Sequence, residues 1–280
     1  MNINTLINKK THFDFSIIFL ILICYITSLN KMKKLVLLLF AVNLILTGCK
    51  KEKGENNDKA NLAGLIKSIS SNGTSIVEFS YNNNAKLITK TIHQGTTEVI
   101  VKYEYSGNKL SSETAKQNNS IVWQYTYEYN NSNLLTRVNL GGVTDTYWEM
   151  SYDSNGKIQE AVQYISGGES KKQEYSYNGD NLVEAALFFR FGSIWELQER
   201  YEFEYDNLNN PYYALHLPFT EEISEFAGLV SPNNITYETR YDENNNVIYE
   251  FQYQITYNTD HFPIHIVELS SQETYDIAYY

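Results

Sequence analysis

The sequence is poor in cysteine. Its 280 residues include only Cys24 and Cys49, and both lie ahead of residue 62, where the strand-like patterns begin. No disulfide and no thiol catalyst is therefore available to the chain that follows Cys49. A scaffold held by disulfides and a cysteine-dependent enzyme are both excluded.

Basic residues are also few. Lys and Arg together number 22, against 33 Asp and Glu, which gives a formal net charge of -11. This balance excludes nucleic acid and an anionic lipid surface as partners, because both need clustered Lys and Arg.

Catalytic motifs are missing as well. The sequence contains no Gly-rich phosphate loop, no Ser-His-Asp order and no nucleophile elbow. The many carboxylates could include a pair at glycosidase spacing, but nothing in the sequence selects one. We therefore expect a protein without enzymatic activity and without a cofactor.

Tyrosine, in contrast, is abundant, with 24 copies. In the stretch YTYEYNNSNLL, residues 125–135, three tyrosines alternate with Thr126 and Glu128. This alternation predicts a β-strand with rings on one face and polar side chains on the other. The Asn-rich segment that follows predicts a turn, and the two leucines open a return strand.

The same pattern recurs along the chain. A tyrosine at the end of an aromatic strand, followed by an Asn- or Asp-rich turn, occurs at Tyr81, Tyr105, Tyr129, Tyr152, Tyr177, Tyr205, Tyr241 and Tyr257. Five of the seven intervals lie close to 24 residues, so the chain is an array of hairpin repeats. Two strands per period predict an all-β, antiparallel up-and-down meander of about sixteen strands. Strand twist should curl such a sheet into an open or closed barrel.

The first 62 residues are not expected to belong to this fold. Residues 32–48 have the basic start and apolar run of a secretory signal. Their end, LTGC, resembles the bacterial lipobox, which implies that Cys49 carries a lipid and anchors an exported protein in the outer membrane, on its periplasmic or surface face. Residues 49–62 are charged and predict a flexible tether, and residues 63–280 form a single β domain.

Residues 1–31 contain a separate apolar run, interrupted by Asp14. We interpret them as upstream sequence translated in frame ahead of the true start at Met32. The alternative is an additional membrane segment near the lower length limit for spanning a bilayer.

Two intervals break the period. The 36-residue interval contains an insertion at about residues 210–234, in which apolar residues at helical spacing predict a short helix with Thr220 as N-cap and Gly228 near its end. This helix would cover a mouth or edge of the sheet, and an ordinary surface loop is the alternative. The 16-residue interval has room for one strand, so the turn after Tyr257 should lie at the opposite end of the sheet from the others.

The motifs YDSNGKI, YDENNNVI and YNGDNLV, which begin at Tyr152, Tyr241 and Tyr177, resemble the tyrosine-aspartate repeats of the Rhs family. The whole pattern from residue 63 is similar to a Bacteroidetes lipoprotein family of unknown function with a porin-like fold. In that family an Asn-Pro, here Asn210-Pro211, and a later Ser-x-Asn-Asn, here SPNN at residues 231–234, precede a final aromatic strand. The resemblance implies a curled antiparallel sheet without an established activity.

The sequence offers no convincing metal site. His261 and His265 are four residues apart, but Pro263 between them excludes a regular helix. Asp153, Asp206 and Asp242 open Asn-rich turns that lack the acidic ladder of a calcium loop. We expect these side chains to cap their own turns.

Three tryptophans are the candidate ligand contacts. Trp123, Trp148 and Trp195 fall in or near successive aromatic strands, where flat rings can stack on sugars or receive a peptide, and core packing is the alternative. The leading hypothesis is a cell-envelope lipoprotein whose β-sheet scaffold binds a glycan or a protein. A purely structural envelope protein is one alternative, and a membrane-spanning β-barrel is another. A ligand site should lie where repetition breaks, in the insertion or at Tyr257.

Overall fold

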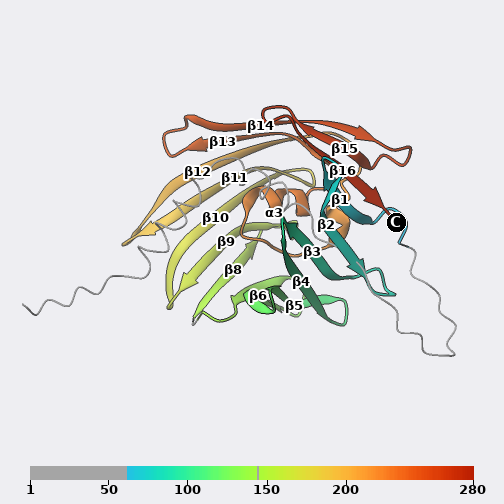
Figure 1. Cartoon of the computed structure of the whole chain (residues 1–280). Helices are drawn as coiled ribbons and strands as arrows, with labels where there is room; N and C mark the ends of the chain where they lie inside the picture. The colour runs from blue at the N-terminus through green and yellow to red at the C-terminus, as the bar shows by residue number, and fades with distance from the viewer. Residues whose placement is uncertain (1–61, 144) are drawn as a thin grey trace, which may run out of the picture. The chain divides into compact units, whose positions relative to one another are not determined.

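The computed structural model describes residues 62–143 and 145–280, which form a closed barrel of sixteen antiparallel strands (Figure 1). The all-β meander predicted from the tyrosine repeats is confirmed, and the sheet closes instead of remaining open. The predicted signal segment, Cys49 and nearly all of the predicted tether lie outside the described residues.

The elements have the following bounds: β1 (Ile66–Ser71), β2 (Thr74–Tyr81), β3 (Leu87–Gln94), β4 (Thr97–Ser106), β5 (Lys109–Gln117), β6 (Ser120–Tyr129), β7 (Leu135–Leu140), β8 (Thr146–Tyr152), β9 (Ile158–Ile165), β10 (Gly168–Asn178), β11 (Asn181–Phe191), β12 (Ile194–Tyr205), the 3-10 helix η1 (Tyr213–Leu215), the helix α3 (Ile223–Val230), β13 (Ile235–Asp242), β14 (Val247–Tyr257), β15 (Pro263–Glu268) and β16 (Glu273–Tyr279).

Each strand pairs with the strands before and after it in the sequence, and β1 closes the barrel by pairing with β16. Ile69 of β1 lies opposite Val77 of β2 on one side and Ile277 of β16 on the other. Closure pairs the backbone groups that an open sheet would expose at its edges.

The two faces of the strands differ as the alternation predicts. Val101, Tyr103 and Ala115 are buried on the inner face. On the outer face, cross-strand ion pairs recur, such as Arg137 with Glu149 at 3.2 Å. The barrel therefore has a largely aromatic and aliphatic interior and a charged exterior.

The two ends of the barrel carry different turns. Seven of the repeat tyrosines, all except Tyr241, precede connections at the same end, which we call the tyrosine end. The hairpins that join β1 to β2, β3 to β4 and so on to β15 and β16 lie at the opposite end, which we call the tip end.

The prediction for the shortened repeat was wrong. The turn after Tyr257 lies at the tyrosine end, and the turn after Tyr241 lies at the tip end. The reason is that the 36-residue interval holds only one strand, β13, because the insertion takes up the remaining length. Because one strand instead of two leads to Tyr241, the turn after Tyr241 falls at the tip end. The single strand β14 then brings the turn after Tyr257 back to the tyrosine end.

All eight repeat tyrosines follow a pairing irregularity. At each one, the partner strand contributes one extra residue, as where Glu104 pairs with Ser112 but Tyr105 pairs with Leu110. Such bulges bend a strand and increase its twist. Their repetition near the barrel ends favours the curvature that closes the sheet.

The tyrosine hydroxyls also connect successive repeats. Tyr129 donates to the carbonyl of Leu110 at 3.0 Å, and Tyr152 donates to the carbonyl of Leu135 at 2.6 Å. In both cases the acceptor is the residue paired with the preceding repeat tyrosine. At these positions a side-chain hydrogen bond joins a repeat to the one before it, in addition to the backbone pairing.

The insertion lies inside the barrel. Figure 1 shows α3 surrounded by the strands, and the ring of Phe226 lies 4.8 Å from the ring of Tyr175 on β10. The surface-loop alternative is therefore wrong. The predicted helix ends were also wrong, because Glu222 is the N-cap and the helix continues through Gly228 to Val230. No helix in residues 62–143 or 145–280 is long and apolar enough to cross a bilayer.

Candidate ligand site in the barrel lumen

Two motifs attach the insertion to the tyrosine end. The side-chain amide of Asn210 donates to the carbonyl of Gly228 at 2.6 Å and to that of Ser231 at 2.8 Å. The hydroxyl of Ser231 accepts a hydrogen bond from the backbone N–H of Leu182 at 3.0 Å. Because Asn210 and Ser231 are buried, these contacts satisfy polar groups that have little access to water.

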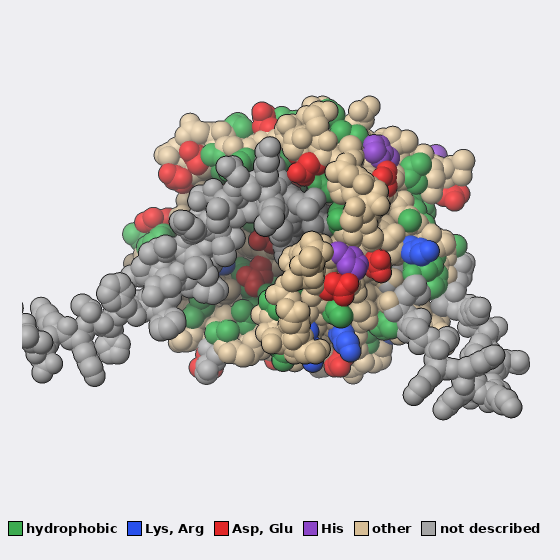
Figure 2. All heavy atoms as spheres, viewed as in Figure 1, with side chains coloured by type: hydrophobic (Ala, Val, Ile, Leu, Met, Phe, Trp, Pro, Cys, Tyr) green, Lys and Arg blue, Asp and Glu red, His purple; other side chains and the backbone are tan. Residues whose placement is uncertain are grey.

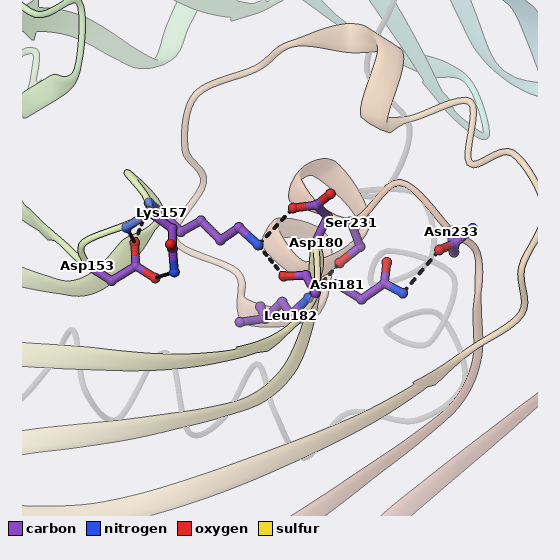
Figure 3. A network of polar contacts seen from close by, with 9 residues as sticks. Asp153, Lys157, Asp180, Asn181, Leu182, Ser231 and Asn233 are labelled. Atoms are coloured by element: carbon purple, nitrogen blue, oxygen red, sulfur yellow. Dashed lines mark hydrogen bonds and ion pairs between the residues drawn. The ribbon is translucent and has the colours of Figure 1, made fainter.

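Figure 3 shows how this attachment continues into the neighbouring turns. Asn181 donates to the side chain of Asn233 at 3.1 Å, and Lys157 forms an ion pair with Asp180 at 2.9 Å. The Asn-Pro and SPNN segments therefore hold the insertion against the ends of β9 to β11.

The insertion and the wall formed by β3 to β7 enclose a cavity of about 290 Å³. This volume is near the lower limit for small-molecule sites. The lining combines aromatic rings, aliphatic side chains and ionisable groups: Lys90, Glu113, Trp123, Tyr125, Tyr127, Val138, Leu217, Phe219, Thr220, Glu221, Glu222, Glu225 and Leu229. The insertion supplies seven of these residues, so interruption of the repeat creates much of the site.

Hydrogen bonds fix the carboxylates of the cavity. Glu113 accepts from the indole of Trp123 at 2.9 Å and from the hydroxyl of Tyr127 at 3.1 Å. Glu221 accepts from the hydroxyl of Tyr125 at 2.9 Å. Aromatic residues from β6 therefore orient acidic groups on β5 and on the insertion.

Lys90 and Glu225 form the buried centre of the site. Their residues are 2% and 3% exposed, and the hydroxyl of Thr220 donates to Glu225 at 2.7 Å. Burial lowers the pKa of Lys90, although the negative charge of Glu225 opposes this shift. Burial raises the pKa of Glu225 to about 8, and the positive charge of Lys90 opposes that shift. Burial likewise raises the pKa of Glu113.

The lumen remains accessible beyond this centre. Glu222 is exposed, and Trp123 and Tyr125 are half-buried, although all three line the interior cavity. At the tyrosine end, the insertion and the repeat turns line a second pocket, which includes Tyr129, Tyr152 and Phe226. Figure 2 shows acidic side chains gathered in a hollow on one face of the barrel.

This arrangement suits a ligand with hydroxyl groups and an apolar face. Carboxylates accept hydrogen bonds from hydroxyls, a protonated carboxyl also donates one, and the rings of Trp123 and Tyr125 offer flat apolar surfaces. The described residues contain no group of three or more His, Cys, Asp or Glu positioned to hold a metal ion.

The three predicted tryptophans occupy different environments. Trp123 lines the cavity, whereas Trp148 is completely buried and packs against Phe219, with ring centroids 5.5 Å apart. Trp195 contacts the cations of Lys172 and Arg190. Strand register places Trp195 on the outer face. It pairs with Arg190, which lies on the same face of the sheet as Lys172. The structure therefore does not bring the three rings together.

The other sequence candidates lie in turns or on the outside. His261 adopts positive φ in a turn, and Nδ1 of His265 lies 2.6 Å from the carboxylate of Asp276 on the exterior. Asp153 and Asp242 accept hydrogen bonds from backbone N–H groups of their own turns. Asp206 accepts from the N–H groups of Leu208 and Asn234, and therefore closes the base of the insertion.

Sequence reasoning missed Lys90, Glu113 and Glu225. Two signals could have located the first two. Lys90 lies two residues before buried Ile92, and therefore on the same face of its strand. Glu113 lies two residues before buried Ala115, again on the same face. Glu225 lies within the insertion whose helix was predicted, but nothing in the sequence indicated that this helix enters the barrel.

Comparisons with known proteins give similarities of structure only. No protein-family model matches the sequence, and no significant match occurs among curated proteins. A porin-like protein from Bacteroides vulgatus aligns with a TM-score of 0.39 and 13% identity over 77% of this chain and 98% of that chain. A porin-like protein from Bacteroides uniformis aligns with a TM-score of 0.39 and 12% identity over 69% and 95% of the two chains. The TcdB2-TccC3 structure aligns with a TM-score of 0.30 and 11% identity over 76% and 14%.

Proposed function

We propose that this protein is a non-catalytic binding module of the bacterial cell envelope, anchored through a lipid on Cys49, and that its lumen binds a small glycan. The observation that supports the ligand site is the cavity in which Trp123 and Tyr125 lie beside hydrogen-bonded carboxylates. A sugar ring has an apolar face for the aromatic rings and hydroxyls for the carboxylates.

The composition of the outer face supports a barrel surrounded by water. Lys172 contacts Glu174 at 2.5 Å and Glu160 at 3.8 Å on this face, and Arg200 contacts Glu184 at 3.9 Å. A Lys or Arg facing lipid at the bilayer midplane would cost about 2–4 kcal/mol. A lipid-anchored barrel therefore fits this exterior better than a membrane-spanning one.

A glycan array probed with the full-length protein tests the ligand class. We expect binding of one or more saccharides by the wild-type protein, and at least about tenfold weaker binding by Trp123→Ala. The matched control is Trp195→Ala, which removes an indole from the outer face and should bind like wild type. Absence of any bound saccharide, or equal binding by Trp123→Ala, would favour a purely structural role.

A second variant guards against misfolding of Trp123→Ala. Glu221→Gln keeps an acceptor for Tyr125 but removes the charge, and near-UV circular dichroism reports whether the aromatic interior is intact.

The anchor is tested separately by incorporation of labelled palmitate, which Cys49→Ala should abolish. Labelling that persists in Cys49→Ala would refute lipidation at this residue.

A further inference from the structure

Exposed apolar side chains gather at the tip end of the barrel. Of the thirteen large hydrophobic residues that are exposed among the described residues, ten lie at or beside the tip-end hairpins. They belong to six consecutive hairpins, from β5–β6 to β15–β16: Ile121, Val122, Val143, Ile165, Phe191, Ile194, Val247, Ile248, Tyr249 and Leu269. We call these ten residues the apolar rim.

The opposite end shows the contrast. In residues 82–86, 106–109, 130–133 and 153–157, its turns are built from Asn, Asp, Ser, Gly and Lys, with Ala85 as the one exception. Both ends of the sheet meet the same need to reverse the chain, and polar turn residues meet it at the tyrosine end. Turn formation therefore does not explain exposed Ile194 and Ile121, which are 62% and 58% exposed.

Charge around the apolar rim has one predominant sign. In the hairpin segments 116–122, 140–146, 165–169, 190–195, 242–249 and 268–273, six residues are acidic and two, Lys116 and Arg190, are basic. Lys116 is exposed and pairs with Ile121, and Glu268 is the one buried acid among the six. Arg190 itself lies 3.6 Å from Glu169. The lumen behind the apolar rim adds exposed Glu222. A second acidic copy and an anionic membrane would both be repelled by this end.

We propose that the apolar rim is a docking surface for a partner protein segment that combines apolar side chains with Lys or Arg. Apolar contacts supply the buried area, and the acidic residues around them select a basic partner. The described chain enters β1 at Ile66 and leaves β16 at Tyr279, both at the tyrosine end. Both ends of the described barrel strands therefore lie away from the apolar rim.

Binding of the full-length protein to short immobilised peptides of three compositions tests this surface. The compositions are apolar with basic residues, apolar with acidic residues, and basic without apolar residues. We expect the first to bind most tightly, and added salt to weaken it. The double variant Phe191→Ser/Ile194→Ser should bind at least about tenfold more weakly. Ile264→Ser, an exposed position at the tyrosine end, is the matched control.

Each other outcome overturns the proposal. Equal binding of acidic and basic apolar peptides would remove the role of charge, and no peptide binding would remove the docking surface. Flotation with phosphatidylcholine vesicles that depends on Phe191 and Ile194 would assign the apolar rim to lipid. Sedimentation showing a dimer that the double variant abolishes would assign it to a second copy. The glycan test uses variants of the lumen, so a failure of that test can be told apart from a failure of this one.

Discussion

The indole nitrogen of Trp123 donates a hydrogen bond to Oε1 of Glu113 across the β5–β6 pair, at 2.9 Å. The aromatic strand thus holds a carboxylate whose pKa burial has already raised. We expect Trp123→Phe to lower the free energy of unfolding by about 1–2 kcal/mol, because Glu113 loses one of its two donors. Urea denaturation measures the change. Trp195→Phe should change stability less, and equal losses in the two variants would contradict this role.

Removal of the side-chain amide of Asn210, at the base of the insertion, should loosen α3. Asn210→Ala leaves the buried carbonyls of Gly228 and Ser231 without their amide donor. We expect a loss of about 2–3 kcal/mol and faster hydrogen exchange in residues 223–230. Asn131→Ala, in an exposed turn, is the control. Unchanged exchange in α3 would show that Asn210 does not hold the insertion.

The buried carboxyl of Glu225 should make stability depend on pH. Its pKa rises from the ordinary 4.5 to about 8 in the fold because of burial. Between these values the folded state retains a proton that the unfolded chain has released, so this group's contribution falls as pH rises toward 8. Glu225→Gln has no such proton. Its stability relative to wild type should therefore be higher at pH 8 than at pH 5.

Urea titrations of both proteins at the two pH values measure this difference. Lys90, Glu113 and Glu222 also face the site and remain in both proteins. Because Glu225 and Lys90 shift each other's pKa, the difference between the two proteins reports the titration of this buried pair. A difference between the variants that is the same at pH 5 and pH 8 would refute the raised pKa.

The turn after Tyr81 contains a residue poorly suited to its backbone. In five turns of this type, the fourth residue has positive φ, and in the first of them that residue is Ala85, at +56°. The equivalent residue after Tyr152 is Gly156, at +78°. We expect Ala85→Gly to raise the thermal midpoint through a gain of about 0.5–1 kcal/mol, because glycine adopts this conformation without steric cost. Gly156→Ala should have the opposite sign, and a destabilised Ala85→Gly would contradict the argument.

The period of the tyrosines was sufficient to predict strand number and antiparallel order. This is because side chains that alternate with a period of two residues, and Asn-rich turns, are local properties of the chain. Closure followed from twist, although the sequence left open and closed sheets as alternatives. The pairing irregularity before every repeat tyrosine had no separate signal, since a bulge adds one residue that looks like part of the strand or turn.

The site was harder to predict because long-range placement creates it. Trp123 and Trp195 both occur in aromatic strands, yet opposite alternation places one in the lumen and the other outside. The helix of the insertion was predicted from its periodicity, whereas its position inside the barrel depends on the contacts of Asn210 and Ser231. Those contacts join residues from distant parts of the chain, which local patterns do not report.

The pairing of Ile69 with Ile277 also determines the order in which the protein can fold. Every other strand pair can form soon after its second strand is made, but the seam between β1 and β16 must wait for the last strand. Before that moment the sheet has two open edges, which are templates for association with other chains. Closing the seam is also the most non-local step, and such contacts are slow to form. We therefore expect the late, nearly complete chain to be the stage most prone to aggregation, and the closed barrel to be protected from it.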